Sequence, residues 1–320
     1  MHKNESVLSK ISLIFSMLIF GTIGIFKKSI PLPSGTLAMF RGLIGAVFLI
    51  LLTVLMRKKI NFSVIKKNLV FLVISGALIG FNWILLFESY NYTSVASSTL
   101  CYYMAPVFVI FASPVFLKEK LTVKQTVCSF LAIFGMILVS GVLEVGFKNI
   151  NEFIGVFLAL GAALLYASVI IMNKKMSSIG AFEKTIIQLM AAGTTIIPYS
   201  LIFENINTGA LNHTTILLVL VVGLLHTGIA YALYFSSFKN IKAQTAAIYS
   251  YIDPIFAILL SVFLLREKMS ILAIIGSIIV LGSTLICELN FKKGAVKKQS
   301  KKPEVHSQMR TSDTFLSKRC

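Results

Sequence analysis

The chain has 320 residues, of which 57% are hydrophobic and 13% charged, and its mean hydropathy is +0.87. A soluble domain carries about 25% charged residues, so this chain has too few polar side chains to cover a surface that faces water. A net charge of +18 would suggest a nucleic-acid partner in a soluble protein. Here the basic residues lie between apolar runs and in the C-terminal segment, so we expect a lipid bilayer and no nucleic acid as the partner.

Apolar runs of about 20 residues, long enough to cross a hydrocarbon core of roughly 30 Å, follow one another along the chain with short loops. There are ten, at 9–26, 34–56, 68–88, 94–117, 123–143, 151–172, 181–203, 213–238, 243–265 and 270–289. The runs are continuous and do not alternate, so they predict helices and not barrel strands. No small-residue cleavage site follows the first run, which we interpret as a retained helix.

The distribution of positive charge predicts the orientation. With a cytoplasmic N-terminus, 24 Lys and Arg residues fall on cytoplasmic segments and five on external loops, as the positive-inside rule requires. We therefore expect a multi-pass protein of the cell (plasma or inner) membrane with both termini cytoplasmic. The four cysteines form no CxxC or Cys/His cluster, so we expect no metal site and no cofactor.

The second half of the sequence repeats features of the first at an offset of 148 residues. The matched residues are Tyr103 with Tyr251, Pro106 with Pro254, and Lys118-Glu-Lys with Arg266-Glu-Lys. Five spans is an odd number, so two copies would have opposite orientations, which is typical of alternating access. The predicted fold is an all-α integral membrane protein with ten transmembrane helices as two inverted five-helix repeats. The repeats would occupy residues 1–148 and 149–290, and a basic disordered cytoplasmic tail would occupy 291–320.

The repeated motifs also carry a resemblance to a known family. They are Tyr103-Met-Ala-Pro106 with Lys118-Glu-Lys-Leu-Thr122, Tyr251-Ile-Asp-Pro254 with Arg266-Glu-Lys-Met-Ser270, and Arg41-Gly-Leu-Ile in the second span. Over about residues 5–290 the sequence resembles the EamA-type branch of the drug/metabolite transporter superfamily. The resemblance implies an inverted five-plus-five fold around a central cavity that carries amino acids or related metabolites, often outward. It implies a class of substrate and not a single one.

Asp253 is the most informative single residue. It lies about ten residues inside an expected span, roughly 15 Å deep at 1.5 Å per residue, where a carboxylate costs about 2.5–3.5 kcal/mol. It must face a cavity, pair with a cation or be protonated. We expect a role in proton coupling or in binding a substrate amine, together with Tyr249 on the same helix face. The alternative is a neutral acid that bonds to Tyr249 or to backbone freed by Pro254.

Other polar and aromatic residues inside the spans complete the predicted substrate site. Pro106 and Pro254 would kink their helices in corresponding places, and paired interruptions point to a transporter site. Trp83, Tyr103, Tyr231 and Tyr251 would form an aromatic wall, with Asn82 beside it, or would only pack. Arg41 would either extend its side chain towards the membrane surface or bind a substrate carboxylate with two hydrogen bonds.

The predicted function is secondary active transport of small metabolites such as amino acids, with export and proton coupling, by a monomer or weak dimer. One alternative is a membrane scaffold or receptor that does not transport. Another is an intramembrane enzyme, but an aspartyl type needs two mid-membrane carboxylates and only Asp253 is so placed. We therefore expect no enzyme activity and no catalytic residues.

Overall fold

The computed structural model describes residues 2–57, 60–118, 120–139, 150–176, 178–205, 211–237 and 249–289. Every regular element that these residues form is a helix, so the prediction of an all-α membrane protein is confirmed for this part of the chain. The expected basic tail at 291–320 lies outside it, as does Glu119 of the first Lys-Glu-Lys motif.

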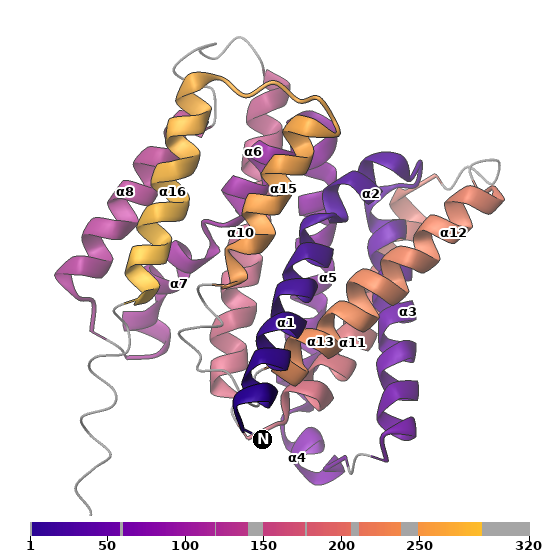
Figure 1. Ribbon diagram of the computed structural model, residues 1–320. Coiled ribbons are helices and arrows are strands. Elements are labelled where there is room, and N and C mark those ends of the chain that lie inside the picture. Colours follow the sequence, from indigo (N-terminus) through magenta and orange to yellow (C-terminus); the bar gives the residue numbers. More distant parts are fainter. Residues whose placement is uncertain are drawn as a thin grey trace, which may run out of the picture. The chain divides into compact units, whose positions relative to one another are not determined.

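The helices follow the apolar runs in chain order (Figure 1). They are α1 (His2–Gly21), α2 (Ile23–Ser29), α3 (Ser34–Leu55), α4 (Phe62–Lys67), α5 (Leu69–Tyr92), α6 (Val95–Tyr102), α7 (Ala105–Phe116), α8 (Val123–Val139), α10 (Ile150–Lys175), α11 (Ala181–Phe203), α12 (His213–Val221), the π-helix η3 (Val222–Ile229), α13 (Ala230–Ser237), α15 (Ile252–Phe263) and α16 (Ile271–Leu289).

Seven helical stretches among the described residues are long and apolar enough to cross a bilayer. They are Val7–Ser29, Ser34–Leu55, Leu69–Tyr92, Val95–Phe116, Ile150–Lys175, Ala181–Phe203 and His213–Tyr234. Three further apolar helices, Val123–Val139, Ile252–Phe263 and Ile271–Ile286, are shorter. They correspond to the expected spans 123–143, 243–265 and 270–289, the first two of which extend beyond the described residues. The count of ten crossings is therefore not confirmed and stays a prediction.

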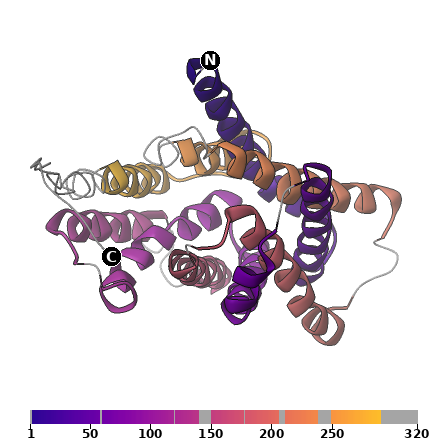
Figure 2. The same cartoon turned by 90° about the horizontal axis from the view of Figure 1, so that it is seen from below.

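Helices that are distant in sequence pack side by side. α10 runs along α5, α11 packs on both α3 and α5, and α16 packs along α8, a pairing that is plain in Figures 1 and 2. α1 lies against α13 and α15. The largest core cluster joins α3, α5 and α11 and includes the fully buried Leu37, Leu49, Phe87 and Ile196. Several expected site residues lie on these packed helices.

Three of the long spans are interrupted by non-α-helical backbone. Thr22 forms a turn between α1 and α2, and Tyr103 and Met104 form a turn between α6 and α7. The eight-residue π-helix η3 lies between α12 and α13. π-helical segments occur frequently at functional sites. The interruptions also bring side chains into contact with other helices: the turn between α6 and α7 contacts α15, and η3 contacts α3.

The repeated motif at the helix ends has the same backbone geometry in both copies. Lys118 and Arg266, which are 148 residues apart, have left-handed φ angles of 55° and 54°. Thr122 and Gln125 exchange hydrogen bonds at the start of α8, with the Gln125 amide donating to Thr122 Oγ1 at 3.3 Å and the Thr122 amide donating to Gln125 Oε1 at 2.8 Å. This is a capping box. The described part of the motif therefore has a structural role in ending one helix and starting the next.

Candidate functional site

A hydrogen bond joins Asp253 to Tyr103. The Tyr103 hydroxyl donates to Asp253 Oδ2 at 2.8 Å. Tyr103 lies in the turn between α6 and α7, and Asp253 lies in the first turn of α15. Both side chains are half-buried, so each keeps some accessible surface. Tyr103, which was expected in the aromatic wall, therefore contacts Asp253, although the two residues are 150 positions apart in the sequence.

The two prolines lie just beyond these residues. Pro106 is in the first turn of α7 and Pro254 in the first turn of α15. Proline fits the first turn of a helix, where its missing N–H is not needed, but not the helix interior. The first-half span is therefore a broken helix and not a continuous kinked one, and the residue at the break, Tyr103, faces Asp253.

Close contact between backbones holds Asp253 in place. Gly21, the last residue of α1, packs on α15, and a Cβ atom at Gly21 would lie 2.9 Å from the Asp253 carbonyl oxygen. A larger residue at this position would push α1 away from the start of α15. The end of α1 therefore packs against the backbone of the first turn of α15, at Asp253.

Further tyrosines surround the Asp253–Tyr103 pair. The ring of Tyr102 makes an edge contact with Tyr103, with centroids 6.2 Å apart, and stacks on Tyr166, with centroids 5.5 Å apart. Tyr90, Tyr102, Tyr166 and Tyr231 all lie close enough to Asp253 to interact with it electrostatically. Of the predicted wall, Tyr231 therefore lies near the Asp253–Tyr103 pair, and Tyr90, Tyr102 and Tyr166 lie near it as well.

Arg41 lies inside the bundle and does not extend to the membrane surface. It is 5% exposed and its guanidinium carbon lies 4.2 Å from the Trp83 ring centroid and 5.3 Å from that of Phe87. Its Nε atom donates to Thr227 Oγ1 at 3.1 Å. Of the two roles expected for Arg41, extension towards the surface is therefore wrong. Trp83 contacts the cation and not the Asp253 pair.

The hydrogen bonds of Asn82 are used within the protein. Its side chain is 1% exposed, and Nδ2 donates to the Ala162 carbonyl oxygen at 2.5 Å, which links α5 to α10. Its Oδ1 accepts a long hydrogen bond from Tyr102 at 3.5 Å. Asn82 thus positions Tyr102, and its expected contact with substrate stays a prediction.

Tyr249 and Tyr251 differ in their surroundings. Tyr249 packs beside the buried Leu13 and Met17 of α1, and Tyr251 is buried at the start of α15. Their predicted roles in binding are not tested by these contacts. The hydrogen-bond partner that the structure shows for Asp253 is Tyr103, and the alternative of a bond to Tyr249 stays untested.

Thr227, Tyr90 and Tyr102 were missed by sequence reasoning. Thr227 lies in η3, where the neighbouring His226 is fully buried and shares a 2.7 Å hydrogen bond between its Nε2 and Thr22 Oγ1. A threonine inside an apolar run gives no signal, because its hydroxyl usually bonds to its own helix. Only the packing of η3 against α3 reveals that Thr227 faces Arg41.

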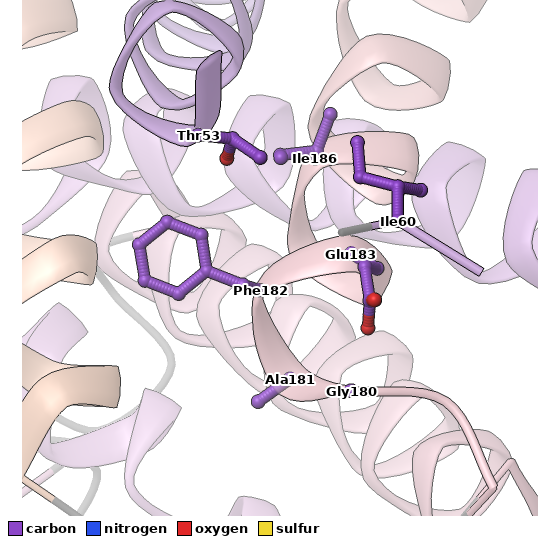
Figure 3. A pocket seen from close by; sticks show the side chains of 7 residues that line it. All are labelled: Thr53, Ile60, Gly180, Ala181, Phe182, Glu183 and Ile186. Carbon is purple, nitrogen blue, oxygen red and sulfur yellow. The ribbon is translucent and has the colours of Figure 1, made fainter. Parts of the chain in front are cut away.

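A pocket of about 240 Å³ lies apart from these residues (Figure 3). It lies between the end of α3 and the start of α11, and its lining residues are Thr53, Ile60, Gly180, Ala181, Phe182, Glu183 and Ile186. None of the predicted site residues lines it. Its wall is largely apolar with one carboxylate, so we do not assign the candidate site to it.

Comparisons with known proteins agree with this architecture. The model of the EamA-like transporter family matches residues 8–141 and again 153–288. The chain is 29% identical over 271 residues to the uncharacterized transporter YxxF of Bacillus subtilis (strain 168), covering 81% of this chain and 85% of that protein. It is 26% identical to solute carrier family 35 member G1 of Mus musculus, over 51% of this chain and 46% of that one. A crystal structure with 18% identity superposes with a TM-score of 0.63, covering 91% of this chain and 99% of that one, which shows a shared fold.

Proposed function

We propose, since the chain belongs to the EamA-like transporter family, that it is a secondary active exporter of small metabolites such as amino acids. As a multi-pass membrane transporter it has the lipid bilayer and a small-molecule substrate as partners. The observation that carries the finer proposal is the hydrogen bond from Tyr103 to Asp253. It supports proton coupling and a substrate site between the two matched regions of the chain.

The hydrogen bond connects those two regions directly. Tyr103 belongs to the region at 8–141 and Asp253 to the region at 153–288. An ionised carboxylate accepts a hydroxyl hydrogen bond more strongly than a neutral acid does. Protonation of Asp253 therefore weakens the link between the regions, and deprotonation strengthens it. The two regions separate more readily when a proton, or a cationic group of the substrate, neutralises Asp253.

Alternating access is the mechanism that suits this arrangement. We propose that residues 1–148 and 149–290 form repeats of opposite orientation, which move against each other around a central site. The helix breaks before Pro106 and near Pro254 lie at the site, and Pro106 and Pro254 act there as gating positions. One chain then completes the pathway, so a monomer is sufficient.

The excess of Lys and Arg on one side supports a cell-membrane protein with both termini in the cytoplasm. A protease site placed after Cys320 should be cut in inverted vesicles and protected in intact cells. Cleavage in intact cells would reverse the proposed orientation without touching the proposed activity.

The decisive experiment is counterflow of labelled amino acids into proteoliposomes, with and without a pH gradient. Wild type should show counterflow that the gradient accelerates. Asp253→Asn keeps the shape of the side chain but cannot exchange a proton, so we expect it to lose the response to the gradient. Asp253→Glu is the matched control and should keep it in part.

The outcomes separate the activity from its coupling. An Asp253→Asn variant that transports normally at every pH contradicts the role of Asp253 in coupling and leaves the transporter in place. Folded wild-type protein that shows no counterflow of amino acids contradicts the substrate class. The same absence for a wider set of metabolites would favour a membrane protein that does not transport.

A further inference from the structure

We propose that Arg41 is the anion-binding residue of the transport site, and that the transported metabolite carries a carboxylate that binds the outer edge of its guanidinium group. This inference rests on the proposed transport function and narrows its substrate class. It is drawn from four features of Arg41: its burial, its lack of an acidic partner among the described residues, the groups that fix its plane, and the tyrosines around it.

Arg41 is a permanent positive charge in an apolar environment. It is the eighth residue of α3 and 5% exposed, and a guanidinium group does not lose its proton in proteins. Charged side chains within spanning segments usually pair with one another or mark substrate pathways. Arg41 and Asp253 form no ion pair with each other. Arg41 donates a hydrogen bond to Thr227, and Asp253 accepts one from Tyr103. The charge of Arg41 is therefore not balanced by the carboxyl group of Asp253.

The contacts that Arg41 makes with described residues use only part of the guanidinium group. Trp83 and Phe87, one turn apart on α5, lie within cation–π distance of the guanidinium group. Thr227 accepts from Nε. A guanidinium group has five N–H donors, and among the described residues only Thr227 accepts from one of them, so the four on the two terminal nitrogens remain within this part of the chain. One N–H on each terminal nitrogen points along the outer edge of the group, and this pair can bind a carboxylate with two parallel hydrogen bonds.

The aromatic contacts also fix the direction of that edge. The rings and the hydroxyl come from two different helices, α5 and η3, so the guanidinium plane cannot rotate without losing one of them. A group held in this way loses little conformational freedom when an anion binds, which favours affinity. A single buried cation balances one negative charge, so a carboxylate suits it better than a doubly charged phosphate.

Tyrosines connect the surroundings of Arg41 with those of Asp253. Tyr90, Tyr102 and Tyr231 interact electrostatically with Arg41, and the same three interact with Asp253. The phenol groups therefore lie near both a fixed cation and a carboxyl group. A metabolite whose carboxylate binds Arg41 extends among phenol groups, and an amino group on it would face Asp253.

A purely structural role for Arg41 makes a different prediction. If Arg41 only connected α3 to α5 and η3, its replacement would lower stability and would not change which solutes are carried. An anion-binding role requires wild type to prefer acids to their amides. It also requires a variant without the guanidinium group to lose that preference while it remains folded.

The test compares L-amino acids with the corresponding L-amino-acid amides, which lack only the carboxylate, as competitors of counterflow. In wild type we expect the acids to compete at least about tenfold better, the loss that follows when one charge-assisted hydrogen bond is removed. Arg41→Lys keeps the charge but not the paired geometry, so its KM for acids should rise about tenfold. Arg41→Gln should treat acids and amides alike. Size-exclusion profiles in detergent verify that each variant is folded.

Each outcome has one consequence. Amides that compete as well as acids in wild type overturn the proposal and leave transport intact. An Arg41→Lys variant with unchanged KM and unchanged discrimination also overturns it. If folded wild type transports neither series, both the proposed function and this inference fail. If Arg41→Gln does not fold, the comparison of the two series in wild type and in Arg41→Lys still decides.

Discussion

Replacement of Gly276 by alanine tests the packing of the helices most directly. Gly276 of α16 crosses Gly135 of α8, and a Cβ atom at Gly276 would lie 2.5 Å from the Gly135 carbonyl oxygen. Ordinary contacts of a Cβ atom begin at 3.4 Å. A backbone carbonyl cannot move aside as the end of a flexible side chain can, so α8 and α16 must separate at this crossing.

The expected decrease in the free energy of unfolding of Gly276→Ala follows from two opposing effects. Overpacking costs about 1–3 kcal/mol, and alanine regains about 1 kcal/mol of helix propensity relative to glycine. We therefore expect Gly276→Ala to lower the free energy of unfolding by up to about 2 kcal/mol. Gly282 in the same helix is the matched control, since no atom lies within 4 Å of a Cβ built there. Gly282→Ala should be neutral or stabilise by up to about 1 kcal/mol.

The assay is thermal unfolding of both variants and wild type in one detergent. We expect a lower Tm for Gly276→Ala and an unchanged or higher Tm for Gly282→Ala. Equal shifts in the two variants would refute the close crossing of α8 and α16, because only one of the two positions is predicted to be crowded. A loss at Gly135→Ala, where the Cβ atom would lie 2.8 Å from the Gly276 carbonyl oxygen, would support it from the other side.

Two further stability predictions concern polar links between helices. Glu204 accepts hydrogen bonds from the Gly35 amide, the Thr36 amide and the Thr36 hydroxyl at 2.7–2.8 Å. Glu204→Gln removes the negative charge at the start of α3 and should therefore lower the free energy of unfolding by about 1 kcal/mol. An unchanged Tm would contradict this, and Thr36→Val, which removes only the hydroxyl, should cost less. Asn82→Leu should lower stability by about 1–2 kcal/mol because the Ala162 carbonyl loses its donor, and a more stable Asn82→Leu protein would show that this hydrogen bond does not hold α5 to α10.

The sequence predicted the positions of those helices whose apolar run has clearly marked ends. The expected span 34–56 begins after Pro33 and corresponds to α3, and the span 181–203 corresponds to α11. Proline also located the helix breaks, since Pro106 and Pro254 follow them within three residues. The form of the break was not predicted, because a proline in a long apolar run is compatible with a kink or with the first turn of a new helix.

Contacts between distant helices were beyond sequence reasoning. Asp253 and Arg41 were both selected because charge is costly inside a membrane. Their partners Tyr103 and Thr227 depend on which helices pack together, and apolar runs of similar composition do not specify that. Tyr249 was named as one alternative partner of Asp253 because it shares a helix face with it. The hydroxyl that the tertiary arrangement supplies comes from the turn between α6 and α7.

Positions that are alike in the two matched regions and positions that differ meet separate requirements, one for backbone geometry and one for proton coupling under the proposed mechanism. Positions that are alike in the two matched regions, such as Lys118 and Arg266 with φ angles of 55° and 54°, determine backbone geometry. The two regions can exchange conformations only if their backbones are similar, so such positions are restricted by the proposed alternating access. Asp253 has Ala105 as its counterpart. A second carboxylate at that place would add another buried negative charge beside the first, and like charges at close range oppose ionisation of both. One acid is enough to bind one proton, so under the proposed mechanism the asymmetric position carries the coupling and the symmetric positions carry the motion.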